Sequence, residues 1–380
     1  MDINALYAHG LLGSSKKLSS WVRPSDWPAM PTPATQEIDI LSAVWNNGSN
    51  YCALAVTVSS GTVTIDWGDG TAPQTYTSGA TAQYQYSYSA SGLGALTAEG
   101  YKTAIVKITP TAGGATISSF SLGKRHSAIS VSASNPWLDL QVNAPSCTSM
   151  QVHDSGANSE YLQRCNMLAI GAVTSLAACF YNCYALQSVT WPVGSLSAVT
   201  GLGSCFLNCY ALQSVTWPVG SLSAVTDLGG CFQSCYALQS VTWPVGSLSA
   251  VTSLAACFNS CSALQSVTWP VGSLSAVTDL GSCFLNCSAL QSVTWPVGSL
   301  GAVTTVASSF NSCPSLADIE NCAIPVTFSV ANCNLSAANL NAIYTALPVV
   351  VSQTITVTGN VGDGTDTQSI ATTKGWTVTA

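Results

Sequence analysis

The sequence predicts a mainly β chain in which a β-sandwich precedes a solenoid. One segment occurs five times with a fixed step of 26 residues, and before it, residues 37–110 alternate short strand patterns with Gly, Ser and Asn turns. A repeat this short cannot bury its own apolar face, so neighbouring coils must cover it. The five copies begin at Cys179, Cys205, Cys231, Cys257 and Cys283.

The apolar positions of each repeat predict a short strand, a turn and an irregular or short helical return. In the first repeat the strand is expected at residues 187–191, with Val189 and Trp191 facing inward and Ser188 and Thr190 outward. The predicted core tryptophans are Trp191, Trp217, Trp243, Trp269 and Trp295. The predicted exposed binding face is Ser188, Thr190, Ser214, Thr216, Ser240, Thr242, Ser266, Thr268, Ser292 and Thr294.

These hydroxyls can hydrogen-bond a polar polymer such as a glycan, or another copy of the sheet. Two alternative interpretations stay open. The tryptophans can instead form an exposed stripe that stacks on sugars, and the hydroxyls can serve solubility alone.

The motif Phe-x-x-Cys-x-x-Leu-x-x-Val-x-x-Pro runs from Phe180 through Cys183, Leu186 and Val189 to Pro192. It resembles the BspA-type leucine-rich repeat of bacterial surface proteins and phage proteins, over residues 145–335. The resemblance implies a leucine-rich-repeat solenoid. This version has Trp where Ile is usual and a somewhat longer unit.

The 16 cysteines include pairs four residues apart in the repeats, such as Cys179 with Cys183 and Cys205 with Cys209. We favour buried thiols stacked as small apolar groups. Disulfides between coils are the alternative, because a coil spacing of ~4.8 Å falls within the disulfide range. No Cys-x-x-Cys pair and no repeat histidine supports zinc, so no metal or cofactor is expected.

Residues 1–36 combine Trp21, Arg23 and Trp27 with four prolines and read as an extended arm. We expect an arm that docks into other proteins of a particle, because tryptophans seldom sit in a segment without contacts. A disordered tail is the alternative.

Residues 65–71, Ile-Asp-Trp-Gly-Asp-Gly-Thr, together with a later Tyr-rich strand, resemble the signature of a PKD domain. The resemblance covers about 75 residues and implies a spacer and contact module. Trp67 and Asp69 are predicted to be structural residues of the turn. Asp66 and Asp69 alone make a short ligand set for Ca²⁺, which takes roughly six to eight oxygens.

The expected domains are an arm (1–36), a PKD-like sandwich (37–110), degenerate first coils (111–178), repeats (179–334) and a C-terminal cap (335–380). The cap should contain a helix from a Ser336 cap through Leu347 and strands at 354–358 and 376–379. Terminal repeats of a solenoid are expected to be atypical.

Composition excludes several functions. Only 7% of residues are charged, nine are basic and the net charge is −7, which argues against nucleic acid. The sequence has no run of 18 apolar residues, so we expect no membrane insertion. His9, His126 and His153 lie outside the repeats without triad spacing, so we expect no enzyme.

The first functional hypothesis is a phage virion protein that anchors through its arm and displays the solenoid for adhesion to a glycan or protein on host or environmental surfaces. It is motivated by the lack of a recognisable export signal beside modules that usually work outside cells. The alternatives are a cementing protein of a shell or filament, including contacts in a homo-oligomer, and a bacterial cell-surface adhesin. A threonine-array ice binder is more remote.

Overall fold

The computed structural model describes residues 22–48, 50–129, 134–153 and 158–380. The chain divides into two compact units, residues 1–174 with 178–195 and residues 175–177 with 196–380. Most regular structure is β, which confirms the predicted fold class. Within the described ranges, no helix has the length and apolar character needed to cross a membrane.

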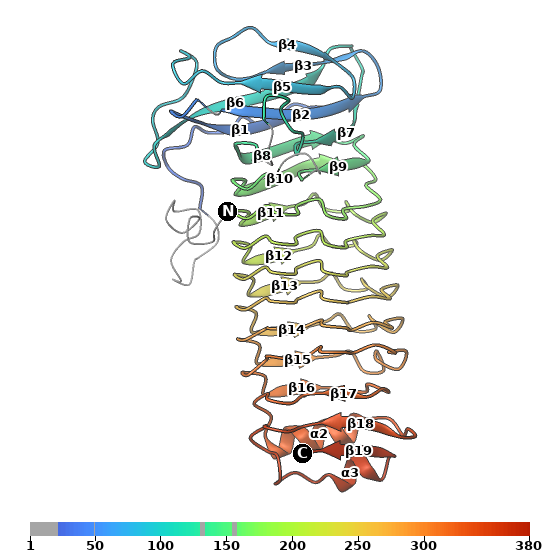
Figure 1. The fold of residues 1–380 in the computed structure, drawn as a ribbon. Helices are drawn as coiled ribbons and strands as arrows, with labels where there is room; N and C mark the ends of the chain where they lie inside the picture. The colour runs from blue at the N-terminus through green and yellow to red at the C-terminus, as the bar shows by residue number, and fades with distance from the viewer. Residues whose placement is uncertain (1–21, 49, 130–133, 154–157) are drawn as a thin grey trace. The chain divides into compact units, whose positions relative to one another are not determined.

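The described residues of the first unit form eleven strands (Figure 1). They are β1 (Glu37–Trp45), β2 (Tyr51–Val58), β3 (Thr62–Asp66), β4 (Gln74–Thr77), β5 (Thr81–Gln85), β6 (Tyr101–Pro110), β7 (Ile117–Ser121), β8 (Trp137–Ala144), β9 (Ser149–Gln151), β10 (Arg164–Ile170) and β11 (Ser188–Thr190). One sheet has the order β11-β10-β8-β1-β6-β3-β4, and a second has the order β5-β2-β7-β9.

Both sheets change from antiparallel to parallel pairing. β8 pairs antiparallel with β1 but parallel with β10. Likewise, β7 pairs antiparallel with β2 but parallel with β9. The first coils therefore extend the two sheets of the sandwich. The expected boundary at residue 111 needs correction, because Phe120 of β7 pairs with Val56 of the sandwich.

Strand positions in the sandwich were predicted with one omission and one shift. The strand patterns of residues 37–110 predict strands at 38–45, 51–58, 62–67, 83–88 and 102–109, which correspond to β1, β2, β3, β5 and β6. The strand expected at 83–88 lies at β5, Thr81–Gln85, and β4 was not predicted. β1 is buried on both faces, although its sequence alternates Ile38 and Ile40 with Glu37 and Asp39. A half-buried strand normally alternates in this way, so a second layer must cover the polar face.

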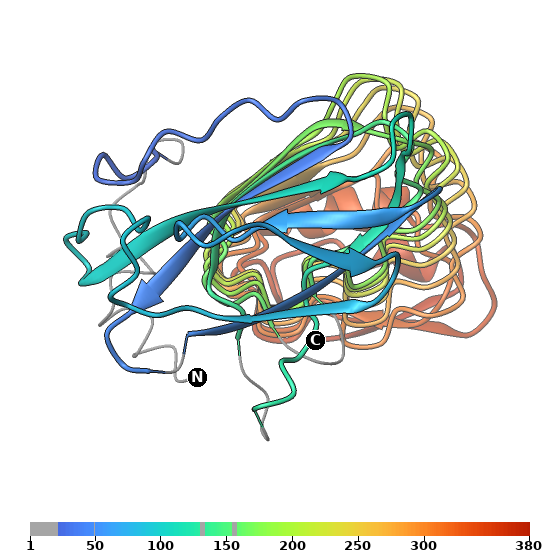
Figure 2. The same ribbon diagram turned by 90° about the horizontal axis from the view of Figure 1, so that it is seen from above.

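The second unit is a stack of coils, each with one short strand (Figure 1). The strands are β12 (Ser214–Thr216), β13 (Ser240–Thr242), β14 (Ser266–Thr268), β15 (Ser292–Thr294) and β16 (Asp318–Glu320). β12 pairs parallel with β13, and β14, β15 and β16 form a second parallel ladder. Viewed in Figure 2, the yellow and orange coils follow nearly the same path.

The C-terminal cap contains a short sheet and two helices: β17 (Phe328–Ser329), α2 (Ala337–Ala346), β18 (Gln353–Thr356), α3 (Ser369–Thr372) and β19 (Trp376–Thr379). The predicted cap of α2 is confirmed, because Ser336 accepts a hydrogen bond from the backbone N–H of Asn339. At the other end, Lys374 Nζ donates to the carbonyls of Tyr344, Thr345 and Leu347. This ammonium group satisfies carbonyls that the helix leaves unpaired.

Candidate functional site

The strand face of the second unit presents serine and threonine in exact register. Ser214 lies opposite Ser240 and Thr216 opposite Thr242, and the same pairing joins residues 266–268 to 292–294. The valine between each pair points the other way and is buried or half-buried. The period of two thus separates a hydroxyl surface from an apolar core.

Most hydroxyls on this face hydrogen-bond no other protein group. Within the described chain, Ser214, Thr216, Ser240, Thr242, Ser266 and Thr268 are exposed and their side chains make no hydrogen bond. Thr294 differs, because its Oγ1 bonds Glu320 Oε2 at 3.1 Å. In the first unit, Thr190 Oγ1 bonds Asn166 Oδ1. The central coils therefore offer unpaired donors and acceptors to a ligand.

A second column of threonines looks equivalent to the strand face in sequence, but its hydroxyls already hydrogen-bond the protein. Thr226, Thr252, Thr278 and Thr304 each donate from backbone N–H and from Oγ1 to the carbonyl of the threonine one coil earlier. These Oγ1 distances are 3.1–3.2 Å. The sequence analysis did not distinguish this column, which holds neighbouring coils together.

Aromatic rings stack along the core beneath the strand face. Trp243 and Trp269 have centroids 5.5 Å apart, and Phe232 and Phe258 are also 5.5 Å apart with nearly parallel planes. Trp217, Trp243, Trp269 and Trp295 are buried, while Trp191 of the first unit is half-buried. The structure thus places the four repeat indoles of the second unit in the core beneath the strand face.

The indole N–H groups of Trp243, Trp269 and Trp295 are buried and have no hydrogen-bond acceptor among the described residues. Each of these indoles packs at a steep angle against a phenylalanine of its own coil, as Trp243 does with Phe232 at 73°. A ring face can accept a hydrogen bond from an N–H group, at a fraction of the strength of a carbonyl.

All 16 cysteines are free and buried. In the second unit, the thiols of Cys235, Cys261, Cys287 and Cys313 each donate to a phenylalanine carbonyl one coil earlier, as Cys261 Sγ does to Phe232 O at 3.0 Å. Burial raises the pKa of the Cys261 thiol well above its ordinary value. Cys179, Cys183, Cys205 and Cys209 are buried in the same way, so the repeat thiols are core residues.

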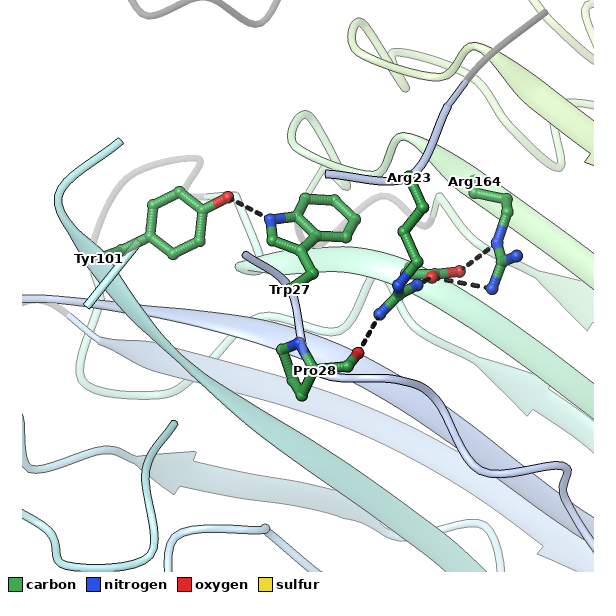
Figure 3. Close-up of polar contacts among 6 residues, drawn as sticks. Arg23, Trp27, Pro28, Tyr101 and Arg164 are labelled. Atoms are coloured by element: carbon green, nitrogen blue, oxygen red, sulfur yellow. Dashed lines mark hydrogen bonds and ion pairs between the residues drawn. The ribbon is translucent and has the colours of Figure 1, made fainter. Parts of the chain in front are cut away.

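The arm is docked on its own sheet (Figure 3). Trp27 is buried against Leu41, Ala43 and Leu138, and its indole N–H donates to the Tyr101 hydroxyl at 2.9 Å. This contact covers Leu41 and Ala43 on the outer face of β1 and contributes to the burial of both faces of that strand. The expectation that Trp27 docks into another protein is therefore wrong, while Trp21 lies outside the described residues.

A buried carboxylate fixes the start of the arm. Asp139 is fully buried and accepts hydrogen bonds from Arg164 at 2.7 and 2.9 Å and from Arg23 of the arm (Figure 3). Arg23 also donates to the carbonyl of Pro28 at 2.6 Å. Burial and the neighbouring Arg164 lower the pKa of Arg23 to about 10. Arg23 is thus an intramolecular contact, contrary to the expected role in docking a partner.

The Trp67 loop is held by its own carboxylates. Asp69 accepts hydrogen bonds from the backbone and hydroxyl of Thr71 and from the hydroxyl of Tyr84, at 2.6–3.1 Å. Asp66 accepts one from the backbone N–H of Gly68 at 2.9 Å. Trp67 stacks on Tyr84 with centroids 4.7 Å apart. Both carboxylates therefore stabilise the turn, and no metal-binding cluster occurs in the described part of the chain.

The two histidines in the described ranges lie in the first unit against tyrosines. His126 Nδ1 accepts a hydrogen bond from the backbone N–H of Ala128, and its ring lies 4.8 Å from that of Tyr51. His153 lies 4.7 Å from the ring of Tyr181. His9 lies outside the described residues.

Residues 174–317 and 229–347 match the family profile of the BspA type leucine rich repeat region, in six copies. The predicted resemblance is confirmed for this part of the chain, which is a leucine-rich-repeat solenoid. Such a solenoid is typically a scaffold for protein interaction. No curated protein matches the chain.

Solved structures that are similar to the chain include two leucine-rich proteins. A leucine-rich repeat protein from Bacteroides ovatus shares 15% identity over 65% of this chain and 82% of that chain, with a TM-score of 0.28. A leucine rich cell surface protein from Faecalibacterium prausnitzii shares 17% identity over 61% of this chain and 89% of that chain, with a TM-score of 0.24.

Proposed function

We propose that this chain is a non-enzymatic adhesion protein that binds its target through the strand face of the solenoid. The observation that carries the proposal is the array of exposed, unpaired hydroxyls on β12, β13 and β14, with β12 and β13 in register. An uncharged polar array of this kind suits a glycan or a polar protein surface, because each hydroxyl both donates and accepts. The rigid aromatic core limits the entropy lost on binding.

Adhesion is tested by placing charge on the strand face. The variant Thr216→Lys, Thr242→Lys, Thr268→Lys puts three ammonium groups in a row on the strands. A matched control places the same three charges on exposed turn serines at Ser223, Ser249 and Ser275, whose side chains make no hydrogen bond in the structure.

The readout is adsorption of fluorescently labelled full-length chain to a panel of intact bacterial cells. We expect at least a tenfold loss of adsorption for the strand variant and less than a twofold change for the control. Equal adsorption by wild type and strand variant contradicts the use of this face.

A second function, cementing by contacts between protein copies, is favoured by a ridge of exposed valines. Val219, Val245, Val271 and Val297 follow the core tryptophans by two residues and are 78–94% exposed. Exposed apolar side chains in register are typical of a protein-protein contact. Light scattering across a concentration series tests it. Association that Val245→Asp and Val271→Asp together abolish supports cementing, and a monomer at all concentrations rejects it.

We further propose that the display takes place on a phage particle, with a bacterial cell surface as the alternative. The support is the resemblance of the repeats and of residues 37–110 to modules that occur in such proteins. The docked part of the arm belongs to the chain's own fold, so residues 1–21 are the segment to test. Deleting them leaves the Arg23 and Trp27 contacts intact. Unchanged incorporation into particles contradicts an N-terminal anchor.

A further inference from the structure

A column of tyrosines in the repeats ends at Tyr236. Tyrosine precedes the strand by four residues at Tyr184, Tyr210 and Tyr236, and the next two coils have Ser262 and Ser288 instead. Within the second unit, the rings of Tyr210 and Tyr236 are stacked, with centroids 5.0 Å apart and planes at 25°. The column therefore stops with one ring facing a serine.

The backbone keeps its coil spacing across this step. The N–H of Ala263 and the Oγ of Ser262 both donate to the carbonyl of Tyr236, at 3.1 and 3.2 Å. Ala289 and Ser288 repeat the two contacts on the carbonyl of Ser262, at 3.2 and 3.3 Å. Ser262 thus occupies the place in which another tyrosine would continue the stack.

Tyr236 is partly exposed and has a ring stacked on one side. Tyr210 is the one ring that stacks on Tyr236 among the described residues, and Tyr236 is 37% exposed. Its hydroxyl makes no hydrogen bond with a described residue. The Tyr236 ring therefore ends the column, and the next two coils have Ser262 and Ser288 at this position. We call the place where the column ends the step.

The side chains around this step are uncharged and polar. Gln239 and Gln265 are exposed, and both precede the hydroxyl face of their strands by one residue. Ser262 and Ser288 use their protons on backbone carbonyls, which leaves their oxygens as acceptors. From residue 196 to residue 317, the sequence contains two charged residues, Asp227 and Asp279.

We propose that Tyr236 is a stacking platform for a pyranose ring of a neutral glycan, which continues the tyrosine column one coil further. One face of a pyranose presents weakly positive C–H groups, which suit the negative face of an aromatic ring. The sugar hydroxyls then meet the Ser oxygens and the Gln amides. The proposal rests on the proposed adhesion function and specifies its ligand class.

An aromatic side chain of a partner protein fits this step less well. Aromatic anchors of protein interfaces are buried in desolvated pockets. Around Tyr236 the flanking groups are hydroxyls and amides, which would lose hydrogen bonds to water without replacement if an apolar group covered them. A hydroxyl-rich ring replaces those hydrogen bonds.

The test covers the Tyr236 ring on the side away from Tyr210 without removing the ring. Ser262→Leu places an aliphatic side chain over Tyr236, and Ser275→Leu is a matched control at an exposed serine on a turn. A second variant changes Tyr184, Tyr210 and Tyr236 to Ser together, because removing Tyr236 alone would leave Tyr210 as a new end of the column. All variants are made in the full chain, and circular dichroism checks that they fold.

The probe is an array of neutral oligosaccharides built from hexoses, N-acetylhexosamines and deoxyhexoses, with affinities of retained glycans measured by calorimetry. We expect wild type and Ser275→Leu to bind the same glycans within twofold. Ser262→Leu and the triple tyrosine variant should bind at least tenfold more weakly. Unchanged affinity of Ser262→Leu overturns the proposal, as does a wild-type chain that binds no neutral glycan or binds aromatic peptides alone.

The strand-face lysine variant separates this inference from the proposed function. If that variant loses cell adsorption while Ser262→Leu keeps its glycan affinity, the adhesion face stands and the platform is rejected. If Ser262→Leu loses glycan affinity while the lysine variant still adsorbs to cells, the platform stands and the strand face is rejected.

Discussion

Replacing Trp27 by Ala tests whether the arm is an integral layer of the first unit. Trp27 is 5% exposed, contacts Leu41, Ala43 and Leu138, and donates to Tyr101. Removing a fully buried Trp costs roughly 3–5 kcal/mol. Because the arm can detach instead of leaving a cavity, we expect the lower end, about 3 kcal/mol.

Hydrogen exchange followed by mass spectrometry measures this loss of stability and assigns it to particular strands. A change of about 3 kcal/mol lowers amide protection roughly 100-fold, since ~1.4 kcal/mol corresponds to a factor of ten. We expect this loss in peptides from β1 and β6, whose outer face Trp27 covers. Peptides from β12 to β16 should be unchanged.

Two further variants control the experiment. Trp27→Phe keeps most of the apolar contact but loses the hydrogen bond to Tyr101, which should cost about 1 kcal/mol. Val22→Ala changes an exposed residue of the same segment and should have no effect. Full protection of β1 and β6 in Trp27→Ala would refute the conclusion that the arm stabilises this sheet.

The remaining predictions concern pH, packing, backbone geometry and thiols. Burial, and then the neighbouring Glu37, raise the pKa of Asp39 to about 6 although Lys107 opposes them, so the native state binds a proton more tightly than the unfolded chain. Stability of the first unit should therefore rise as pH falls from about 7 to about 4, and Asp39→Asn should flatten this dependence in denaturant titrations; a wild-type curve already flat contradicts it. Phe258→Ala opens a gap in the phenylalanine stack and should cost roughly 3–5 kcal/mol in urea unfolding, against a negligible effect for a turn-serine substitution. Gly68→Ala should prevent correct folding of the sandwich loop, seen as lost near-ultraviolet dichroism, because an added Cβ would lie 2.2 Å from a backbone oxygen. Iodoacetamide should label no repeat thiol in the native chain and all of them in urea; rapid native labelling would mean that the thiols are not buried.

The repeat region was predictable because its pattern is strong. Val189 and Trp191 alternate with Ser188 and Thr190, and the same alternation recurs at a constant step, so the inside and outside of each strand follow from period two. The helix after Ser336 was predictable for a similar reason, since a capping residue precedes Leu340, Ile343 and Tyr344 on one face. Local chemistry decides both features.

The candidate sites were only partly predictable. Sequence alone makes Thr216 and Thr226 look alike, yet Thr216 is unpaired and Thr226 bonds the coil before it. The end of the tyrosine column at Tyr236 is visible in the sequence. Its meaning depends on the parallel stacking of Tyr210 and Tyr236, which requires the coil spacing to be known.

The sequence by itself determined the period of the solenoid, its hydroxyl and apolar faces and its terminal helix. Each of these depends on spacings of a few residues or on an exact repeat. The tertiary structure decided the destination of the arm, because Trp27 meets Tyr101 across 74 residues and Arg23 meets Asp139 across 116. It also decided which hydroxyls stay unpaired. Contacts between distant segments depend on how the sheets and coils come together, and no local pattern encodes that arrangement.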